Sequence, residues 1–136
     1  MKTLIVEDDF ASRKLMQKYL SPLGETDVVV DGDEAVDAFK MAFDENEPYD
    51  LICLDIMLPK KDGQEVLREI REIEEAKGIW GSDGTKVIMT TALGDAENVL
   101  TAFRSQCEGY LQKPISKEQM MRQLRELGLI SEGNTT

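Results

Sequence analysis

Three acidic side chains follow two short apolar runs in this 136-residue chain: Glu7 and Asp8 come directly after "TLIV", and Asp55 ends "LICLD". An ionised carboxylate that loses water beside a core must gain a cation or hydrogen bonds in return. Hard oxygen ligands without cysteine or histidine select Mg²⁺ over transition metals, and the chain has no histidine. If the fold brings the three carboxylates together, they predict a magnesium site.

Two further polar residues close apolar runs: Thr91 ends "KVIMTT" and Lys113 ends "GYLQK". Mg²⁺ needs only one or two protein carboxylates, which leaves Asp55 free to attack phosphorus, as carboxylates do when an aspartyl phosphate forms. Lys113 is then placed to neutralise charge on the transferred group, and Thr91 to donate its hydroxyl to a phosphoryl oxygen. Thr90 is the alternative donor, but strand parity and the following Ala92 favour Thr91.

The elements that must position these residues alternate along the chain. Apolar runs of strand length cover residues 3–6, 27–30, 51–55, 86–91 and 109–113, and several lack polar alternation, which is typical of strands covered on both faces. Apolar residues at helical spacing after each run predict five helices. The fold class is therefore α/β, with a doubly wound five-stranded parallel sheet. Ligands of such sheets bind at the carboxyl ends of the strands, where all these polar residues fall.

Two of the expected helices have recognisable starts. Asp31 is followed three residues later by Glu34, and Ser116 by Gln119. In each pair the first side chain is an acceptor for the free backbone N–H groups of the first helical turn. We expect helices to begin directly after Asp31 and Ser116.

Length and composition indicate one cytoplasmic domain. Hydrophobic residues make up 41% of the chain and charged residues 32%, and no apolar run approaches the ~20 residues that span a bilayer. The start "MKTLIVEDD" reaches acidic residues too soon for a signal peptide. A net charge of −11 disfavours direct binding to nucleic acid and to anionic lipid. Cys53 and Cys107 lie outside any C-x-x-C motif and are expected to be reduced structural thiols.

Four motifs in order, "VEDD", "LDIMLPKKDG", "TTA" and "KP", resemble the receiver domains of two-component response regulators, which have a flavodoxin-like (CheY-like) fold. The resemblance covers residues 1–128, and the remaining residues 129–136 are expected to form a mobile tail. It also implies a cis peptide bond before Pro114. Glu7 stands where many receivers carry Asp, and its longer side chain leaves direct and water-mediated contact with the metal both open.

The resemblance implies roles for particular residues. Those roles are Mg²⁺ binding by Glu7, Asp8, Asp55 and the carbonyl of Met57; phosphorylation of Asp55; catalytic assistance by Thr91 and Lys113; and a conformational switch at Thr91 and Tyr110. Core packing is the alternative role for Tyr110. Met57 and Leu93, two residues after Asp55 and Thr91, are both apolar and are expected to keep water from the phosphoryl group, so that it is long-lived.

The implied function is that of an acceptor and not of a turnover enzyme. A histidine kinase or a histidine phosphotransfer protein would donate the phosphoryl group to Asp55, and the output would be a downstream protein partner or onward transfer in a relay. One alternative is a Mg²⁺-dependent phosphohydrolase with an aspartyl nucleophile, but enzymes of the haloacid-dehalogenase type need an acid where Met57 stands. Another is an interaction module that works without phosphate.

One connection departs from a minimal receiver. Residues 75–86, "EAKGIWGSDGTK", contain three glycines and the only tryptophan, and the segment is longer than the usual ~2–6 residues. It is either a surface excursion or a docking element anchored by Trp80.

Overall fold

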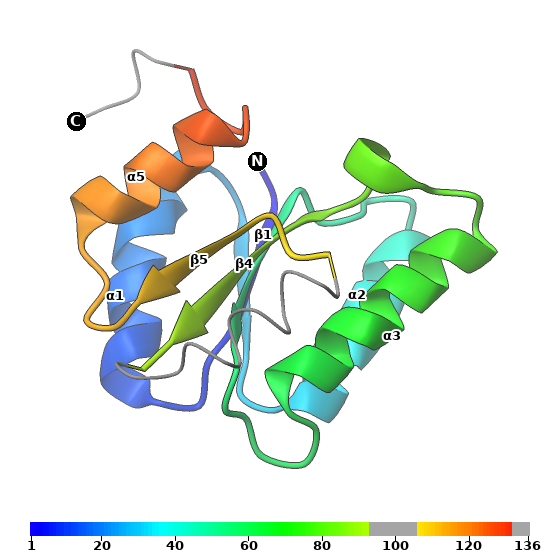
Figure 1. The fold of residues 1–136 in the computed structure, drawn as a ribbon, viewed down its shortest axis with the longest axis horizontal. Coiled ribbons are helices and arrows are strands. Elements are labelled where there is room, and N and C mark those ends of the chain that lie inside the picture. The colour runs from blue at the N-terminus through cyan, green and yellow to red at the C-terminus, as the bar shows by residue number, and fades with distance from the viewer. Residues whose placement is uncertain (93–105, 132–136) are drawn as a thin grey trace.

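The computed structural model describes residues 1–92 and 106–131, whose strands form one parallel sheet (Figure 1). The strands are β1 (Thr3–Val6), β2 (Thr26–Val29), β3 (Leu51–Asp55), β4 (Lys86–Thr91) and β5 (Gly109–Gln112). Their order across the sheet is β2-β1-β3-β4-β5. The chain therefore moves outward from β1 to β2 and then crosses to the other side at β3, and ligands bind at such a switch in strand order.

Helices cover both faces of this sheet. They are α1 (Phe10–Leu20), α2 (Gly32–Asp44), α3 (Gly63–Ala76) and α5 (Lys117–Glu126), with short 3₁₀ turns η1 (Ser21–Leu23) and η2 (Gly81–Asp83). Figure 1 shows α1 and α5 on one face and α2 and α3 on the other. The predicted doubly wound α/β fold is confirmed. The fifth expected helix, the pattern around residues 99–103, lies outside the described residues.

Two strands differ by one residue from the prediction, β2 at both ends and β5 at its end. β2 covers residues 26–29 and not 27–30, because the backbone N–H of Val30 donates to Oε1 of Glu34 (3.1 Å). β5 ends at Gln112 and not at Lys113, although the N–H of Lys113 still donates to the carbonyl of Thr91 (2.8 Å). The bond from Lys113 to Pro114 is cis, as expected.

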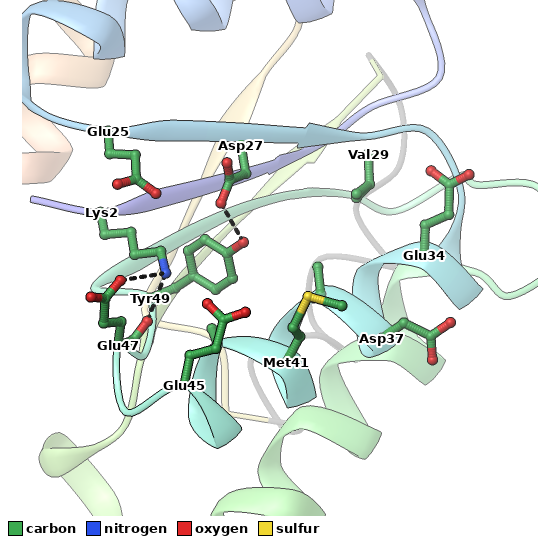
Figure 2. A pocket seen from close by; sticks show the side chains of 12 residues that line it. Lys2, Glu25, Asp27, Val29, Glu34, Asp37, Met41, Glu45, Glu47 and Tyr49 are labelled. Carbon is green, nitrogen blue, oxygen red and sulfur yellow. Dashed lines mark hydrogen bonds and ion pairs between the residues drawn. The ribbon is translucent and has the colours of Figure 1, made fainter.

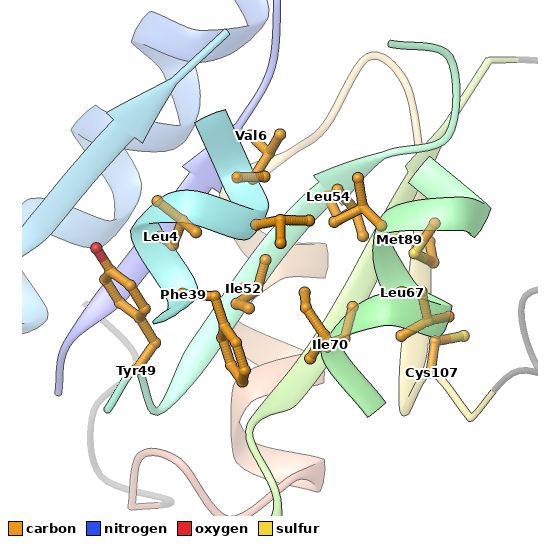
Figure 3. Close-up of a cluster of buried hydrophobic side chains, with 14 of the residues drawn as sticks. Leu4, Val6, Phe39, Tyr49, Ile52, Leu54, Leu67, Ile70, Met89 and Cys107 are labelled. Atoms are coloured by element: carbon orange, nitrogen blue, oxygen red, sulfur yellow. The ribbon is translucent and has the colours of Figure 1, made fainter. Parts of the chain in front are cut away.

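A hydrophobic cluster fills each side of the sheet. The cluster under α2 and α3 includes Leu4, Phe39, Ile52 and Met89 (Figure 3). The cluster under α1 and α5 combines buried residues of those helices with strand residues that alternate with the first set. Because both faces are covered, β1 and β3 are buried along their whole length. This explains why their sequences show no polar alternation. Cys53 and Cys107 are buried and unpaired, as expected.

Side-chain caps begin each described α-helix. Asp31 and Ser116 accept from the backbone N–H of Glu34 (2.9 Å) and Gln119 (3.1 Å), so both predicted starts are confirmed. Asp9 caps α1 and Asp62 caps α3 in the same way. Asp9 and Asp62 therefore help to fix the loops that follow β1 and β3.

A buried arginine holds the end of α3 to the rest of the fold. Arg71 is 9% exposed; its guanidinium donates to Oε1 of Glu74 (2.7 Å) and the carbonyl of Thr85 (2.8 Å). It also donates to the carbonyl of Gln106 (2.8 Å) and to Oε1 of Glu108 (2.9 Å). The sequence pattern did not predict this network, which joins α3 to the start of β4 and to the segment before β5.

The segment after α5 begins in contact with the core. Leu129 and Ile130 are partly buried and pack against the cluster under α1 and α5. This contact differs from the prediction of a mobile tail that covers residues 129–136. Residues 132–136 of that tail lie outside the described residues. No helix in the described ranges is long and apolar enough to cross a membrane.

Candidate functional site

The three carboxylates meet at the carboxyl ends of β1 and β3. These strands are neighbours with Val6 opposite Leu54, so that the residues following them, Glu7 and Asp55, stand side by side. One oxygen from each of Glu7, Asp8 and Asp55 lies within 4.8 Å of the others. Glu7 is 0% and Asp55 5% exposed, whereas Asp8 is exposed. The fold thus brings together the acids that the sequence placed 48 residues apart.

Lys113 supplies the positive charge among them. Its Nζ lies 2.6 Å from Oε1 of Glu7 and 3.0 Å from Oδ2 of Asp55. The residue follows β5, two strands away from β3 in the sheet, so its four-carbon stem spans β4 to reach the acids. One ammonium therefore faces a group of three carboxylates, which leaves the site with excess negative charge.

Burial shapes the protonation of this site. It raises the pKa of Glu7 to about 7; the contact with Lys113 opposes that rise, and the neighbouring Asp55 adds to it. For Lys113, burial lowers the pKa, but the hydrogen bonds and charges of Glu7 and Asp55 outweigh it and hold the pKa above its ordinary value. Lys113 is therefore a permanent cation near neutral pH, whereas Glu7 titrates there.

Glu7 is held by backbone groups as well. Its Oε2 accepts from the N–H of Asp9 (3.0 Å), and its own carbonyl accepts from the guanidinium of Arg13 (3.1 Å). Arg13 also reaches the carbonyl of Asp8 (3.4 Å). Arg13 was not among the predicted site residues, because its only signal in the sequence is a basic residue in the first turns of the helix that follows the acid pair.

The turn after Asp55 fixes its second carboxylate oxygen. Oδ1 of Asp55 accepts from the backbone N–H of Met57 (3.1 Å), and the N–H of Gly63 donates to the carbonyl of Ile56 (2.8 Å). A Cβ at Gly63 would stand 2.2 Å from the carbonyl oxygen of Asp55. The glycine of "KKDG" is therefore required by the close return of the chain to the carboxylate turn.

Met57 presents its side chain to solvent at this turn. The side chain is 64% exposed. Because a thioether is a soft ligand and Mg²⁺ prefers oxygen, any metal contact by this residue would come from its backbone carbonyl. Leu93, its expected companion in keeping water from the phosphoryl group, lies outside the described residues.

The two threonines at the end of β4 have different surroundings. Thr91 is 3% exposed and its hydroxyl donates to the carbonyl of Ala92 (3.1 Å). Thr90 stands opposite Asp55 in the strand register, and its fully buried hydroxyl has no hydrogen-bond partner among the described residues. Strand parity alone therefore does not single out Thr91.

Tyr110 lies on β5 with its side chain 44% exposed. Its register partner on β4 is Met89, which is fully buried. Register partners on neighbouring strands lie on the same face of the sheet, so Tyr110 shares a face with Met89 while remaining partly exposed. The choice between the switch role and core packing for Tyr110 stays a prediction.

Comparison with known families identifies this arrangement. A family model described as "Response regulator receiver domain" matches residues 3–125. The chain belongs to the response regulator receiver family. This receiver domain is thus of the class that accepts and transmits phosphoryl signals in two-component systems, and the family is not one of turnover enzymes.

Individual relatives agree with that assignment. The transcriptional regulatory protein ResD of Bacillus subtilis (strain 168) is 34% identical over 127 residues, which cover 93% of this chain and 47% of ResD. The receiver domain spans about half the length of the curated relatives it matches.

Solved structures are similar across nearly the whole chain. The receiver domain of NtrX from Brucella abortus has a TM-score of 0.76 and 26% identity, and the match covers 95% of this chain and 99% of that one. The receiver domain of the sensor histidine kinase PA1611 from Pseudomonas aeruginosa PAO1 has a TM-score of 0.74 and 27% identity, with 93% and 97% coverage. That structure contains a magnesium ion in its active site cleft.

Proposed function

We propose that this receiver domain accepts a phosphoryl group on a carboxylate oxygen of Asp55 from a phosphohistidine on another protein. The observation that carries the proposal is the contact of Lys113 Nζ with both Asp55 (3.0 Å) and Glu7 (2.6 Å) inside a group of three carboxylates. This arrangement supports three roles at the carboxyl ends of the strands: a nucleophile, a cation for the transferred group, and a site for a second cation. The chain has no histidine of its own to act as donor.

The donor atoms fit Mg²⁺. Three carboxylates within reach of one another, with no sulfur or imidazole, form the hard oxygen set that this ion prefers. Asp8 and Glu7, with Asp55 and the carbonyl of Met57, would hold it, and the magnesium ion of the PA1611 receiver domain supports this assignment. When bound, Mg²⁺ supplies positive charge to the phosphoryl oxygens.

The protein's own residues carry out the transfer. Asp55 attacks phosphorus, the P–N bond to the donor imidazole breaks, and the new P–O bond leaves an acyl phosphate on Asp55. Lys113, which already pairs with Asp55, shifts to the incoming phosphoryl oxygens and keeps its charge. Thr91 donates its hydroxyl to a third oxygen once it releases the carbonyl of Ala92, and the exposed Tyr110 changes position with it as the conformational switch.

The phosphorylated protein would then either bind a downstream protein partner or transfer the phosphoryl group onward in a relay. ResD is named as a transcriptional regulatory protein, so the expectation that this receiver domain itself makes no direct contact with nucleic acid stays a prediction. The cytoplasmic location also stays a prediction.

Intact-mass analysis after incubation with Mg²⁺ and a small-molecule phosphodonor tests the proposal. We expect one phosphoryl group on the native protein and on the control Asp44→Asn, which alters an exposed acid of α2. Asp55→Asn should gain none. Undiminished labelling of Asp55→Asn would contradict the assignment, and continuous release of phosphate over many turnovers would favour a phosphohydrolase.

The choice between the threonines has its own test. Thr91→Ala should slow labelling and weaken the conformational response, whereas Thr90→Ala should leave both close to those of the native protein. The reverse result would transfer the role to Thr90.

A further inference from the structure

An open groove lies between β2 and α2, apart from the carboxylates of the phosphorylation site (Figure 2). It has a volume of about 560 Å³, and β2, which forms one wall, is the edge strand of the described sheet. The other wall is the outward face of α2. The groove is therefore accessible along its length.

Apolar atoms form the middle of this groove. Val29 from β2 and Met41 from α2 face each other across it, as Figure 2 shows. Met41 is 60% exposed, although its neighbours Phe39 and Ala42 on the same helix are buried. A long, polarizable and adaptable side chain in such a position suits contact with another molecule.

Acidic side chains flank that apolar centre at both ends. The groove is lined by Glu25, Asp27, Glu34, Asp37, Glu45 and Glu47. Its single cation, Lys2, is occupied, because Nζ donates to the carbonyl of Glu47 (2.8 Å) and lies 3.9 Å from that carboxylate. Figure 2 shows Glu34 and Asp37 beyond one side of Met41 and Glu45 beyond the other.

Several of these charges lack compensation within the protein. Among the described residues, no ion pair involves Glu25, Asp37 or Glu45. These charges also affect Tyr49. Burial raises the pKa of Tyr49, and its hydrogen bond to Asp27 (2.7 Å) and the charges of Asp27, Glu25 and Glu45 raise it further. A cationic occupant would relieve this repulsion.

We propose that the groove between β2 and α2 is a docking surface for an extended segment of a partner protein in which one apolar side chain stands between two basic ones. Charge complementarity selects the basic residues, and the centre formed by Val29 and Met41 selects the apolar one.

The spacing of the acids sets the spacing of that segment. Asp37, Met41 and Glu45 follow one another at intervals of four residues along α2 and its cap, so the two acids are separated by about 12 Å along the helix axis. An extended chain rises about 3.3 Å per residue and points alternate side chains to one face. The segment therefore has the pattern basic, any residue, apolar, any residue, basic.

A fluorescently labelled peptide with lysine, leucine and lysine at alternate positions and serine between them is the probe. Fluorescence anisotropy should show saturable binding to the full chain. Binding should weaken at least about tenfold for Asp37→Asn combined with Glu45→Gln, and also for Met41→Ser. Glu75→Gln combined with Glu126→Gln, which removes two exposed acids outside the groove, should bind the peptide like the native protein. Asp55→Asn should do the same, which separates docking from phosphorylation.

Several outcomes would overturn the proposal. These are no binding by the native protein at millimolar peptide; equal binding of a peptide of the same composition with adjacent lysines; and an equal loss of binding in the control pair. Equal affinity for a peptide with serine in place of leucine would reduce the groove to a site for small cations, as would displacement of the probe by spermine alone. Circular dichroism of each variant verifies that it is folded.

Discussion

We expect the raised pKa of Glu7 to make Mg²⁺ binding depend on pH within the neutral range. A metal ion competes with the proton for a carboxylate, because only the ionised form is a ligand. With a pKa of about 7, the ionised fraction of Glu7 falls from about nine-tenths at about pH 8 to about one-tenth at about pH 6. The affinity for Mg²⁺ should therefore fall about tenfold, or about 1.4 kcal/mol, over this interval.

Isothermal titration calorimetry with MgCl₂ at a series of pH values measures this effect. Glu7→Gln should bind Mg²⁺ more weakly than the native protein and with little dependence on pH between those limits. Asp44→Asn should retain the native pH profile. Equal affinity at both pH values in the native protein, or a change centred near the ordinary carboxyl pKa of 4.5, would refute the reasoning.

The same shift predicts the stability of the metal-free protein. Because the folded state binds the Glu7 proton more tightly than the unfolded chain does, the free energy of unfolding should fall as the pH rises from 4.5 through about 7. Urea titrations across this window should show the fall in native protein and not in Glu7→Gln. Excess Mg²⁺ at the upper pH should restore stability, since it binds the folded state.

Four further variants test other parts of the structure. Asp8→Ala should remove most Mg²⁺ affinity by deleting a hard oxygen ligand, and an unchanged titration would reassign the site. Met57→Asn should shorten the lifetime of the phosphoryl group severalfold by orienting a water, measured as phosphate loss from purified protein; no acceleration would show that water is controlled elsewhere. Arg71→Leu should lower the free energy of unfolding by about 3 kcal/mol, since it leaves the buried carboxylate of Glu74 and the half-buried carboxylate of Glu108 without their cation; a change below about 1 kcal/mol would contradict this reading. Gly63→Ala should cost more than about 1 kcal/mol, because its Cβ would collide with the backbone of Asp55.

The positions of Glu7, Asp55 and Lys113 followed from the sequence because parallel strands bring their carboxyl ends to one edge. An apolar run that ends in a charged residue therefore predicts a strand, and it also predicts that the charged residue lies at the carboxyl end of the sheet. Cap residues such as Asp31 and Ser116 were equally readable, since their contacts are three residues away.

Contacts between distant segments were not predictable in this way. Arg71 is a charged residue on the buried face of α3, near Leu67 and Ile70, and its burial depends on Glu108, which is 37 residues further along the chain. The choice between Thr90 and Thr91 depends on how β4 ends against β3, which strand parity does not determine. The acidic groove is assembled from β2, α2 and the connection from α2 to β3, together with Lys2. Residues 25–50 contain ten acidic residues and one basic residue, but that excess alone does not show which acids line one groove.

The single tryptophan occupies a position with a practical consequence. Trp80 is 63% exposed and lies in the connection that leads to the start of β4, whereas the carboxylates follow the ends of β1 and β3. Because the strands are parallel, the start of β4 and the ends of β1 and β3 lie at opposite ends of the strands. The length of β4 therefore separates the indole from any ion or phosphoryl group at Asp55. Direct quenching of intrinsic fluorescence by a ligand at the site is therefore not expected. A shift in the emission of Trp80 on phosphorylation would instead report a rearrangement that had crossed the whole sheet.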